Sequence, residues 1–487
     1  MSYYLGLDQG TSSTKAVLVK NNKIIKKYSI SLSTKYLKHG WVEQDPKEII
    51  DNTILCIRKV LANVKKNSNE VVRLGLTNQT ETFVIWDKGN GKPAIPAINW
   101  QCKRSSKIIK KYEKKLNKKE ISNKTGLNLD PTFTATKLLW IKKYKPKIFK
   151  KLEKKQYLFG TLDTWIIWCL TEKREYVTDV TNASRTLLFN IKELNWDKSI
   201  LRQFGLQNIS LPLIKNNDQD FGLIDKKIFK SKIIITASIG DQQSSLYGHK
   251  CFKKGDIKIT LGTGGFIWIN SGNKFINNSK PTCIQTLAWV KDKPVYAFEA
   301  FVVMVGSLID YFIKNLKVAK NFRQLEEKAL KVDKTDLLFF PSLNGLGTPW
   351  WYTKNLGIIY GLNSKTSDKE ISLVVFETVG FLIRSALDTL KKDTNIKFNQ
   401  ISLDGKLSKS KLIQNILISI INNNLKFSDE TDLTSIGAVM LSSRNIHLEK
   451  KINKFKSFSP TNKNKYLNDK YLLWKKFINN IIKKDLT

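Results

Sequence analysis

The chain has 487 residues, which is more than one hydrophobic core normally serves, so we expect two domains. Hydrophobic residues make up 41% of the chain and aromatic residues 10%, which excludes a disordered polymer and indicates packed cores. Lysine and arginine (83) outnumber aspartate and glutamate (42), and a formal net charge of +41 raises the question of a nucleic-acid or membrane partner.

The positive charge is spread along segments that have a helical period. In Lys107 to Lys119 and in Lys142 to Lys155, lysines alternate with apolar residues at helical spacing. Such runs are typical of the solvated faces of amphipathic helices. We therefore expect no nucleic-acid partner, because charge is the only feature that supports one.

The cysteines and the apolar segments bear on location. An odd number of cysteines with no zinc or redox spacing is typical of a reducing cytoplasm, where we expect the protein to act. These cysteines are Cys56, Cys102, Cys169, Cys251 and Cys283. Asp8 interrupts the N-terminal apolar run, so we expect no signal peptide. Ala300 to Ile309 is too short to span a bilayer, which predicts a buried helix there and no membrane insertion. Association with further copies of the chain stays open.

The first predicted element is a hairpin with a polar tip. The apolar run Tyr3 to Leu7 leads to Asp-Gln-Gly-Thr-Ser-Ser at residues 8–13, and Ala16 to Val19 is strand-like again. The following Lys-Asn-Asn-Lys at residues 20–23 is a turn sequence. Glycine at the tip allows a ligand to approach the backbone closely, and the amides and hydroxyls are donors for phosphate oxygens.

The second element of interest is a strand that ends in a polar turn. The run Ile233 to Thr236 leads into Ser238 to Ser245, which contains Asp241 followed by two glutamines. A carboxylate at this place could accept the proton of an attacking hydroxyl group, because phosphoryl transfer needs a local base. The alternative is an aspartate that caps the helix predicted to begin near Gln242, and spacing alone favours this second interpretation.

The third element repeats the first. Ile257 to Leu261 is strand-like, Gly-Thr-Gly-Gly follows at residues 262–265, and Phe266 to Ile269 is the returning strand. A single Gly-Thr tip is a weak signal, because such turns are common in hairpins that bind nothing. Two tips, each near the start of a domain-sized segment, favour two related domains that hold one polyphosphate between them.

The amino-acid sequences of these segments and their order along the chain resemble those of the FGGY carbohydrate kinases, and within that family those of the glycerol kinases most closely. The similarity runs nearly from end to end. The segments that carry it are Leu7 to Ser13, Gly40 to Pro46, Thr77 to Gln79, Trp100 to Cys102, Leu158 to Trp165, Thr178 to Thr186, Gly240 to Gln243, Gly262 to Gly264, Gly345 to Pro349, Gly437 to Ala438 and Trp474 to Lys476.

The resemblance implies an α/β fold of two actin-like (ribonuclease H-like) domains, residues 1–248 and 249–487, with an active-site cleft between them. It implies ATP and Mg²⁺ as cofactors, with domain closure excluding water from the transferred phosphate. By position, Asp241 is the base and Asp8 helps to hold the metal ion. The residues matched to nucleotide binding are Thr11, Ser12, Ser13, Lys15, Thr263, Gly306, Asp310 and Gly405.

The resemblance also gives a polyol site with two departures. The matched substrate residues are Thr80, Glu81, Trp100, Thr132, Asp241, Gln242 and Phe266. Glycerol kinases usually have Arg at the position of Thr80 and Tyr at that of Thr132, so we expect a larger and less well anchored pocket. Lys15, Asp310, Lys406 and Ser410 also depart from the pattern, which leaves nucleotide selectivity open.

The favoured function is ATP-dependent phosphorylation of glycerol to sn-glycerol 3-phosphate. One alternative is the same chemistry on a longer polyol or a ketose, for which Thr80 and Thr132 would have made room. Another is a binding protein without turnover, against which the retention of Asp8, Asp241 and both Gly-Thr tips argues.

Overall fold

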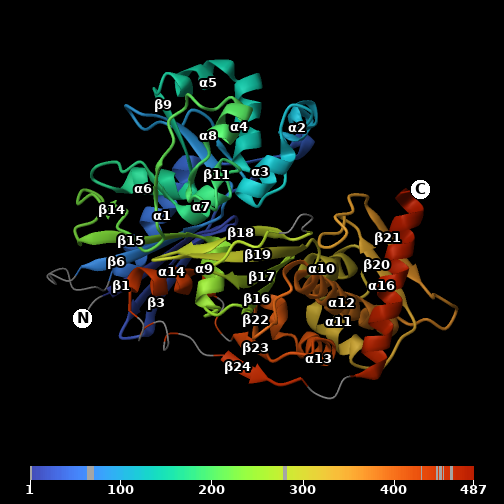
Figure 1. Cartoon of the computed structure of the whole chain (residues 1–487). Helices are drawn as coiled ribbons and strands as arrows, with labels where there is room; N and C mark the ends of the chain where they lie inside the picture. The colour runs from blue at the N-terminus through green and yellow to red at the C-terminus, as the bar shows by residue number, and fades with distance from the viewer. Residues whose placement is uncertain are drawn as a thin grey trace.

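The computed structural model describes residues 3–62, 71–277, 282–428, 430, 432–445, 448, 452, 455–460 and 464–486. Two large sheets organise the chain, the first built mostly from its N-terminal half and the second from its C-terminal half. Figure 1 shows the first at the left, in blue and green, and the second near the centre, in yellow and orange.

The first sheet has six strands in the order β14-β15-β6-β1-β2-β3. Their bounds are β1 (Tyr3–Gln9), β2 (Ser13–Lys20), β3 (Lys23–Ser31), β6 (Val72–Asn78), β14 (Gly222–Leu223) and β15 (Ile233–Gly240). Strands β1, β2 and β3 form an antiparallel meander, whereas β6 runs parallel to β1 and β15 runs parallel to β6. The nearly continuous burial of β6 and β15 is typical of parallel strands that are covered on both faces.

The second sheet has seven strands in the order β18-β19-β17-β16-β22-β23-β24. Their bounds are β16 (Ile257–Leu261), β17 (Gly265–Gly272), β18 (Ile284–Val290), β19 (Pro294–Val302), β22 (Ile401–Asp404), β23 (Leu425–Ser428) and β24 (Phe455–Phe458). Strands β16, β17 and β19 are antiparallel, and β22 and β23 continue in parallel on the other side of β16. Both sheets therefore share one arrangement, which confirms the two ribonuclease H-like halves that the sequence predicts.

Four smaller sheets complete the fold: three lie in the N-terminal half, and the pair β20-β21 lies in the C-terminal half beside α12 and α16. A five-stranded sheet has the order β4-β5-β8-β7-β9, and three pairs complete the set. The bounds are β4 (Lys35–Leu37), β5 (Trp41–Gln44), β7 (Phe83–Asp87), β8 (Ala97–Ile98), β9 (Tyr157–Thr161), β10 (Val177–Asp179), β11 (Phe189–Asn190), β12 (Asn195–Trp196), β13 (Leu213–Lys215), β20 (Leu338–Ser342) and β21 (Leu356–Tyr360).

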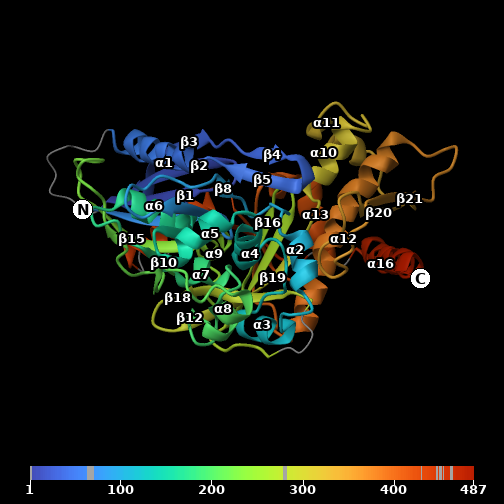
Figure 2. The same cartoon turned by 90° about the horizontal axis from the view of Figure 1, so that it is seen from above.

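Helices cover the sheets and form much of the surface. The described helices are α1 (Pro46–Leu61), α2 (Ser106–Tyr112), α3 (Lys118–Thr125), α4 (Thr134–Tyr144), α5 (Pro146–Glu153), α6 (Leu162–Leu170), α7 (Val180–Ser184), α8 (Lys198–Phe204), α9 (Asp241–Gly248), α10 (Gly306–Lys314), α11 (Phe322–Ala329), α12 (Asp368–Thr394), α13 (Lys411–Ile420), α14 (Leu433–Ser443) and α16 (Lys465–Leu486), with short 3₁₀ turns η1 (Lys38–Gly40) and η2 (Lys406–Lys409). Seen from above, α1 and α16 lie towards opposite ends of the molecule (Figure 2).

Most predicted elements are confirmed, and one is wrong. Both hairpins form, and a helix begins at Asp241. The predicted buried helix at Ala300 to Ile309 is instead the end of β19, a loop, and the start of α10 at Gly306. The apolar run is divided because β19 pairs with β17 up to Val302, and a short apolar run alone does not distinguish a buried strand from a helix.

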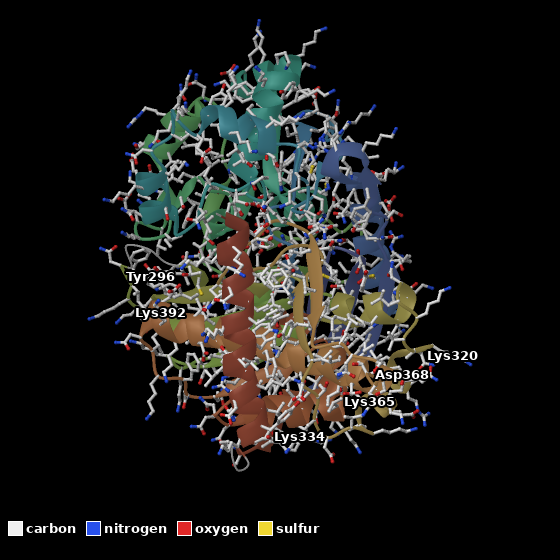
Figure 3. All side chains as sticks on the ribbon, turned by 90° about the vertical axis from the view of Figure 1, so that its right-hand side faces the viewer. Tyr296, Lys320, Lys334, Lys365, Asp368 and Lys392 are labelled. Carbon is white, nitrogen blue, oxygen red and sulfur yellow. The ribbon has the colours of Figure 1, made fainter. Side chains whose placement is uncertain are left out.

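The lysines of residues 107–119 and 142–155 lie on solvated faces, as the helical spacing predicts. Helices α2 and α5 bury apolar residues such as Ile108, Ile109 and Phe149, while their lysines face outward. In Figure 3, exposed lysines such as Lys320 and Lys392 lie far apart on one face of the molecule. Within the described residues, every helix is too short or too polar to cross a membrane.

Helices α9 and α14 join the two sheets. Helix α14 comes from the C-terminal part of the chain, yet it packs on β1, β6 and β15 of the first sheet, and Figure 1 shows it beside those strands. One hydrophobic cluster combines Val17 and Ile239 of the first sheet, Trp268 of the second, Leu246 of α9 and Val439 of α14.

Glycines make this joint unusually close. A Cβ atom built on Gly437 of α14 would lie 1.9 Å from the carbonyl oxygen of Ser244 in α9. A Cβ atom on Gly75 of β6 would lie 2.1 Å from the carbonyl oxygen of Ala438. Both neighbours are backbone atoms, which cannot rotate away as a side chain can. The backbones therefore touch only because these positions lack side chains.

We expect Gly437→Ala to lower the free energy of unfolding by about 1 to 3 kcal/mol or to abolish folding, because the added methyl group overlaps backbone. Gly89→Ala is the matched control, since Gly89 is exposed and its nearest neighbour, at 3.3 Å, is the flexible side chain of Asp87. Denaturant titration of both variants measures the difference. Equal stabilities would show that the joint has room to spare.

Candidate active site

The first hairpin tip is held in place by side chains from several elements. The carbonyl oxygen of Thr11 accepts hydrogen bonds from Gln44 Nε2 (2.8 Å) and Thr34 Oγ1 (3.2 Å). The indole Nε1 of Trp100 donates to Thr11 Oγ1 at 3.0 Å. Ser12 remains exposed. The tip is thus fixed on its inner side and open on its outer side, as a phosphate-binding turn requires.

Asp8 and Lys15 are neighbours at the base of this tip. They are directly opposite in the pairing of β1 with β2. Burial raises the pKa of Asp8 to about 6, although the positive charge of Lys15 acts in the other direction. The Nζ atom of Lys15 lies 3.6 Å from Asp432 Oδ1, close to the start of α14. A partly buried carboxylate and a cation therefore lie just behind the tip.

Asp241 is the first residue of α9 and follows β15 directly. Its Oδ1 accepts a hydrogen bond from the backbone N–H of Gln242 at 2.7 Å, but the N-cap position of α9 is Gly240, so Asp241 is not the capping residue. Burial, together with the negative charges of Asp8 and Glu81, raises the pKa of Asp241 to about 7, against the effects of the Gln242 N–H and of Lys258. Asp8, Glu81 and Asp241 are thus brought together from β1, the β6–β7 turn and α9.

A buried polar network fixes the backbone just before Asp241. The backbone N–H of Gly240 donates to Thr181 Oγ1 at 2.8 Å. Thr181 is held in turn by Asp179, whose other carboxylate oxygen accepts from Ser238 Oγ at 3.0 Å and from Asn182 Nδ2. The position of Asp241 is therefore set by α7 as well as by its own strand.

Glu81 is held by its backbone and by its side chain. Its φ of 62° is in the left-handed region, which is strained for a glutamate. Its carbonyl oxygen accepts from Thr134 Oγ1 (3.3 Å) and Lys137 Nζ (3.4 Å). Its carboxylate accepts from Thr80 Oγ1 (2.7 Å) and Arg185 Nε (2.5 Å). Strain maintained by so many contacts is typical of functional sites.

Arg185 links Glu81 to the second sheet. Its second ion pair, at 3.0 Å, is with Glu299 on β19, and its guanidinium lies 5.4 Å from the ring centre of Phe133. All three charged residues of this bridge are buried. Position 80 lacks a guanidinium group, as the sequence shows, but Arg185 places one on the same glutamate. Thr132 lies next to Phe133, with its backbone N–H donating to Asp130.

The second hairpin tip meets the N-terminus of α10. The backbone N–H of Gly306 donates to the carbonyl oxygen of Gly262 at 2.9 Å, and that of Ser307 donates to Thr263 at 3.1 Å. A Cβ atom on Gly306 would lie 2.6 Å from the carbonyl oxygen of Gly262, so only glycine allows this contact. A Cβ atom on Gly405, which follows β22, would lie similarly close to the carbonyl oxygen of Leu261. The structure thus groups Thr263, Gly306 and Gly405.

The other matched residues, Asp310, Phe266 and Gln242, lie in more varied surroundings. Asp310 is exposed on α10 and pairs with Lys314 at 2.9 Å. The ring of Phe266 lies 4.9 Å from that of Phe301. Gln242, beside Asp241, accepts a hydrogen bond from Lys258 of the second sheet at 2.6 Å. Among the described residues, no group of three or more His, Cys, Asp and Glu side chains could hold a metal ion.

Sequence reasoning assigned no role to Arg185, Lys137, Lys258 or Asp179. Two of them carried a signal. Lys258 interrupts the strand Ile257–Leu261, where every other residue but a threonine is apolar, and a lysine inside such a run needs a buried partner. Arg185 ends a segment of small polar residues that is entirely buried. Their partners are distant in the chain, so the sequence alone could not predict which residues they pair with.

Comparison with known proteins supports the whole-chain similarity. Residues 3–248 match the N-terminal domain of the FGGY family of carbohydrate kinases, and residues 257–446 match its C-terminal domain. A glycerol kinase of Thermoanaerobacter sp. (strain X514) is 35% identical over 491 residues, covering 99% of each chain. Glycerol kinase 2 of Thermotoga maritima is 35% identical over 444 residues, covering 91% of this chain and 89% of that one.

Solved structures agree. Plasmodium falciparum glycerol kinase with ADP has a TM-score of 0.92 at 31% identity, covering 99% of this chain and 98% of that one. A ligand-bound xylulose kinase from Lactobacillus acidophilus has a TM-score of 0.88 at 23% identity, with 99% and 98% of the two chains covered, and shows the same fold. The two matched domains and the full-length relatives show that this chain belongs to the FGGY family of carbohydrate kinases.

Proposed function

We propose that the protein phosphorylates glycerol at a terminal hydroxyl group with ATP, giving sn-glycerol 3-phosphate and ADP. The observation that carries this proposal is the cluster of Asp241, Glu81 and Asp8, in which burial and neighbouring carboxylates raise the pKa of Asp241 to about 7. A base of this pKa can take a proton near neutral pH. The similarity to glycerol kinases along the whole chain supports glycerol as the acceptor.

In the proposed reaction, the Asp241 carboxylate accepts the proton of the attacking hydroxyl group. The hydroxyl oxygen forms a bond to the γ-phosphorus as the bond to the β-phosphate oxygen breaks, and ADP leaves. Glu81 and Gln242 orient the polyol, while Trp100 and Phe266 pack against its carbon chain. The constrained backbone of Glu81 and the hydrogen-bond network at Gly240 hold the Asp241 carboxylate and the polyol in fixed relative positions.

The two hairpin tips would hold the phosphates. Thr11, Ser12 and Ser13 of the first tip and Thr263 of the second have the amides and hydroxyls that phosphate oxygens accept from. Lys15 would add a positive charge. Gly306 would lie along the nucleotide, with Gly405 at the adenosine end. Asp310, one turn beyond Gly306 on the exposed side of α10, would approach the nucleotide from outside.

The residues around Asp8 fit a magnesium ion. Burial raises the pKa of Asp8 and of Asp241, so negative charge there is poorly compensated without a cation. Mg²⁺ is commonly held by one or two carboxylates together with phosphates and water. We propose that Asp8 holds it through its water shell. When bound, the ion would neutralise charge on the β- and γ-phosphates.

The broader assignments follow from the same proposal. We place the domain boundary between residues 248 and 249, so that the polyol and the nucleotide meet between the halves. We also propose a cytoplasmic protein, supported by five unpaired cysteines, and regard its positive charge as incidental to function.

An ADP-release assay on a panel of polyols and ketoses tests the substrate. We expect kcat/KM to be highest for glycerol, because the other matched substrate residues, Glu81, Trp100, Asp241, Gln242 and Phe266, are all present. Each substrate is also assayed without ATP, so that any signal from contaminants of the substrate can be subtracted. A higher kcat/KM for a longer polyol or a ketose would instead mean that Thr80 and Thr132 widen the pocket for extra carbons.

Asp241→Asn should lower turnover by about 100- to 10,000-fold, which is the usual cost of losing a general base. The amide keeps the shape of the side chain but cannot accept the proton. ADP binding, measured by calorimetry, should stay close to that of the wild type. Turnover above a tenth of the wild-type value would remove Asp241 from the role of base.

Arg185→Met should lower the free energy of unfolding by about 3 to 5 kcal/mol, because it removes the guanidinium that pairs directly with two buried carboxylates. Arg185→Met combined with Glu299→Gln should recover part of the loss, since one of those charges is then removed. Denaturant unfolding of the single and double variants measures both effects. A single variant as stable as the wild type would show that the bridge contributes nothing.

A further inference from the structure

Lys258 is a fully buried lysine in the middle of the second sheet. It lies on β16 between Ile257 and Ile259, paired with Trp268 on one side and Ser402 on the other. Burying an ammonium group is costly unless it is paired, so its partners indicate why it is kept. Burial lowers the pKa of Lys258, while the carboxylates of Asp404, Asp241 and Glu299 act to keep it charged.

The ammonium group of Lys258 reaches the polyol site. Its Nζ donates to Gln242 Oε1 at 2.6 Å and to Thr260 Oγ1 at 3.2 Å. Lys258 lies on the second sheet, whereas Gln242 lies on α9, directly after the first sheet. The contact therefore ties the substrate side of the site to the sheet that carries the second hairpin tip.

This contact determines which way the Gln242 amide faces. A lysine ammonium has donors only, so the atom nearest to it must be the amide oxygen. The NH₂ group of Gln242 is then left to face elsewhere, and within the described part of the chain no protein atom accepts a hydrogen bond from it. Gln242 is partly buried, and an amide whose oxygen is paired while its NH₂ group is not can donate that group to a ligand.

We propose that Lys258 is a positioning residue that fixes the Gln242 amide so that its NH₂ group donates to one hydroxyl oxygen of the polyol. That hydroxyl group accepts from Gln242 and keeps its own proton for a carboxylate of the site. The pocket thereby selects a hydroxyl group whose oxygen lies both at hydrogen-bond distance from the Gln242 NH₂ group and in the direction of its N–H bond. This inference rests on the proposed polyol kinase function.

The test compares glycerol with 1,2-propanediol and 1,3-propanediol, each of which lacks one hydroxyl group. They are measured as substrates and as competitive inhibitors of glycerol phosphorylation. In the wild type, the diol that lacks the hydroxyl group facing Gln242 should bind roughly 10- to 100-fold more weakly than glycerol, because the NH₂ group of Gln242 then has no hydroxyl oxygen to donate to.

Lys258→Met frees the amide to rotate. We expect the KM for glycerol to rise about 10-fold with a smaller change in kcat, and the discrimination against that diol to shrink to a few-fold. Lys258→Gln should behave in the same way with less disturbance of the strand. Lys258→Arg keeps a donor-only cation and should restore most of the discrimination.

Lys470→Met is the matched control. Lys470 is another buried lysine, which donates to the backbone of Thr335 and to Glu377, both far from the site in the chain. Its loss should reduce stability without changing the ratio of the glycerol and diol constants. ADP binding, measured on every variant, verifies the fold.

Three outcomes overturn the proposal. One is unchanged discrimination in both neutral variants. Another is an equal loss for all three ligands, which is what a purely structural role predicts. The third is failure of both neutral variants to fold while Lys258→Arg behaves as the wild type. Absence of any polyol phosphorylation by the wild type would instead refute the proposed function itself, and this inference with it.

Discussion

The close packing of α9 on α14 is the constraint on which the rest of the structure depends. Helix α9 carries Asp241 at its start, and α14 lies against the sheet that carries Asp8. Because Gly437 allows the two backbones to touch, Asp241 and the first hairpin tip are set relative to one another within a narrow tolerance. The hydrophobic cluster around Val439 extends this joint to Trp268 of the second sheet. Phosphoryl transfer depends on such positioning more than on covalent chemistry.

Buried charge gives this joint its chemical character. Asp8, Asp241, Glu81 and Glu299 are brought into one region by both sheets, and each is costly to bury alone. Arg185 compensates the two glutamates, and Lys258 compensates part of the charge near Asp241. Asp8 and Asp241 are compensated less completely, and burial raises the pKa of both. A site in that condition is suited to receive a proton and a divalent cation.

Local pattern made the hairpins and the start of α9 predictable, because glycine tips and strand periodicity are written in consecutive residues. The pairs Arg185 with Glu299 and Lys258 with Gln242 were not predictable, since each joins a residue in or next to a helix to a residue on a distant strand, and only the packing of those elements brings them together. The run Ala300 to Ile309 was assigned to one helix because burial, not period, dominates it, and only the pairing of β19 with β17 divides it. The site residues themselves came from resemblance, and the geometry adds which of them share a charge environment.

Phosphorus NMR of the purified protein incubated with ATP, Mg²⁺ and glycerol tests the assignment of phosphoryl transfer most directly. The γ-phosphate signal of ATP should disappear as a phosphomonoester signal of glycerol 3-phosphate grows in equal amount, with ADP as the only other product. Without glycerol, ATP should persist. Unchanged ATP in the complete mixture, or its conversion to inorganic phosphate in place of the ester, would contradict a polyol kinase.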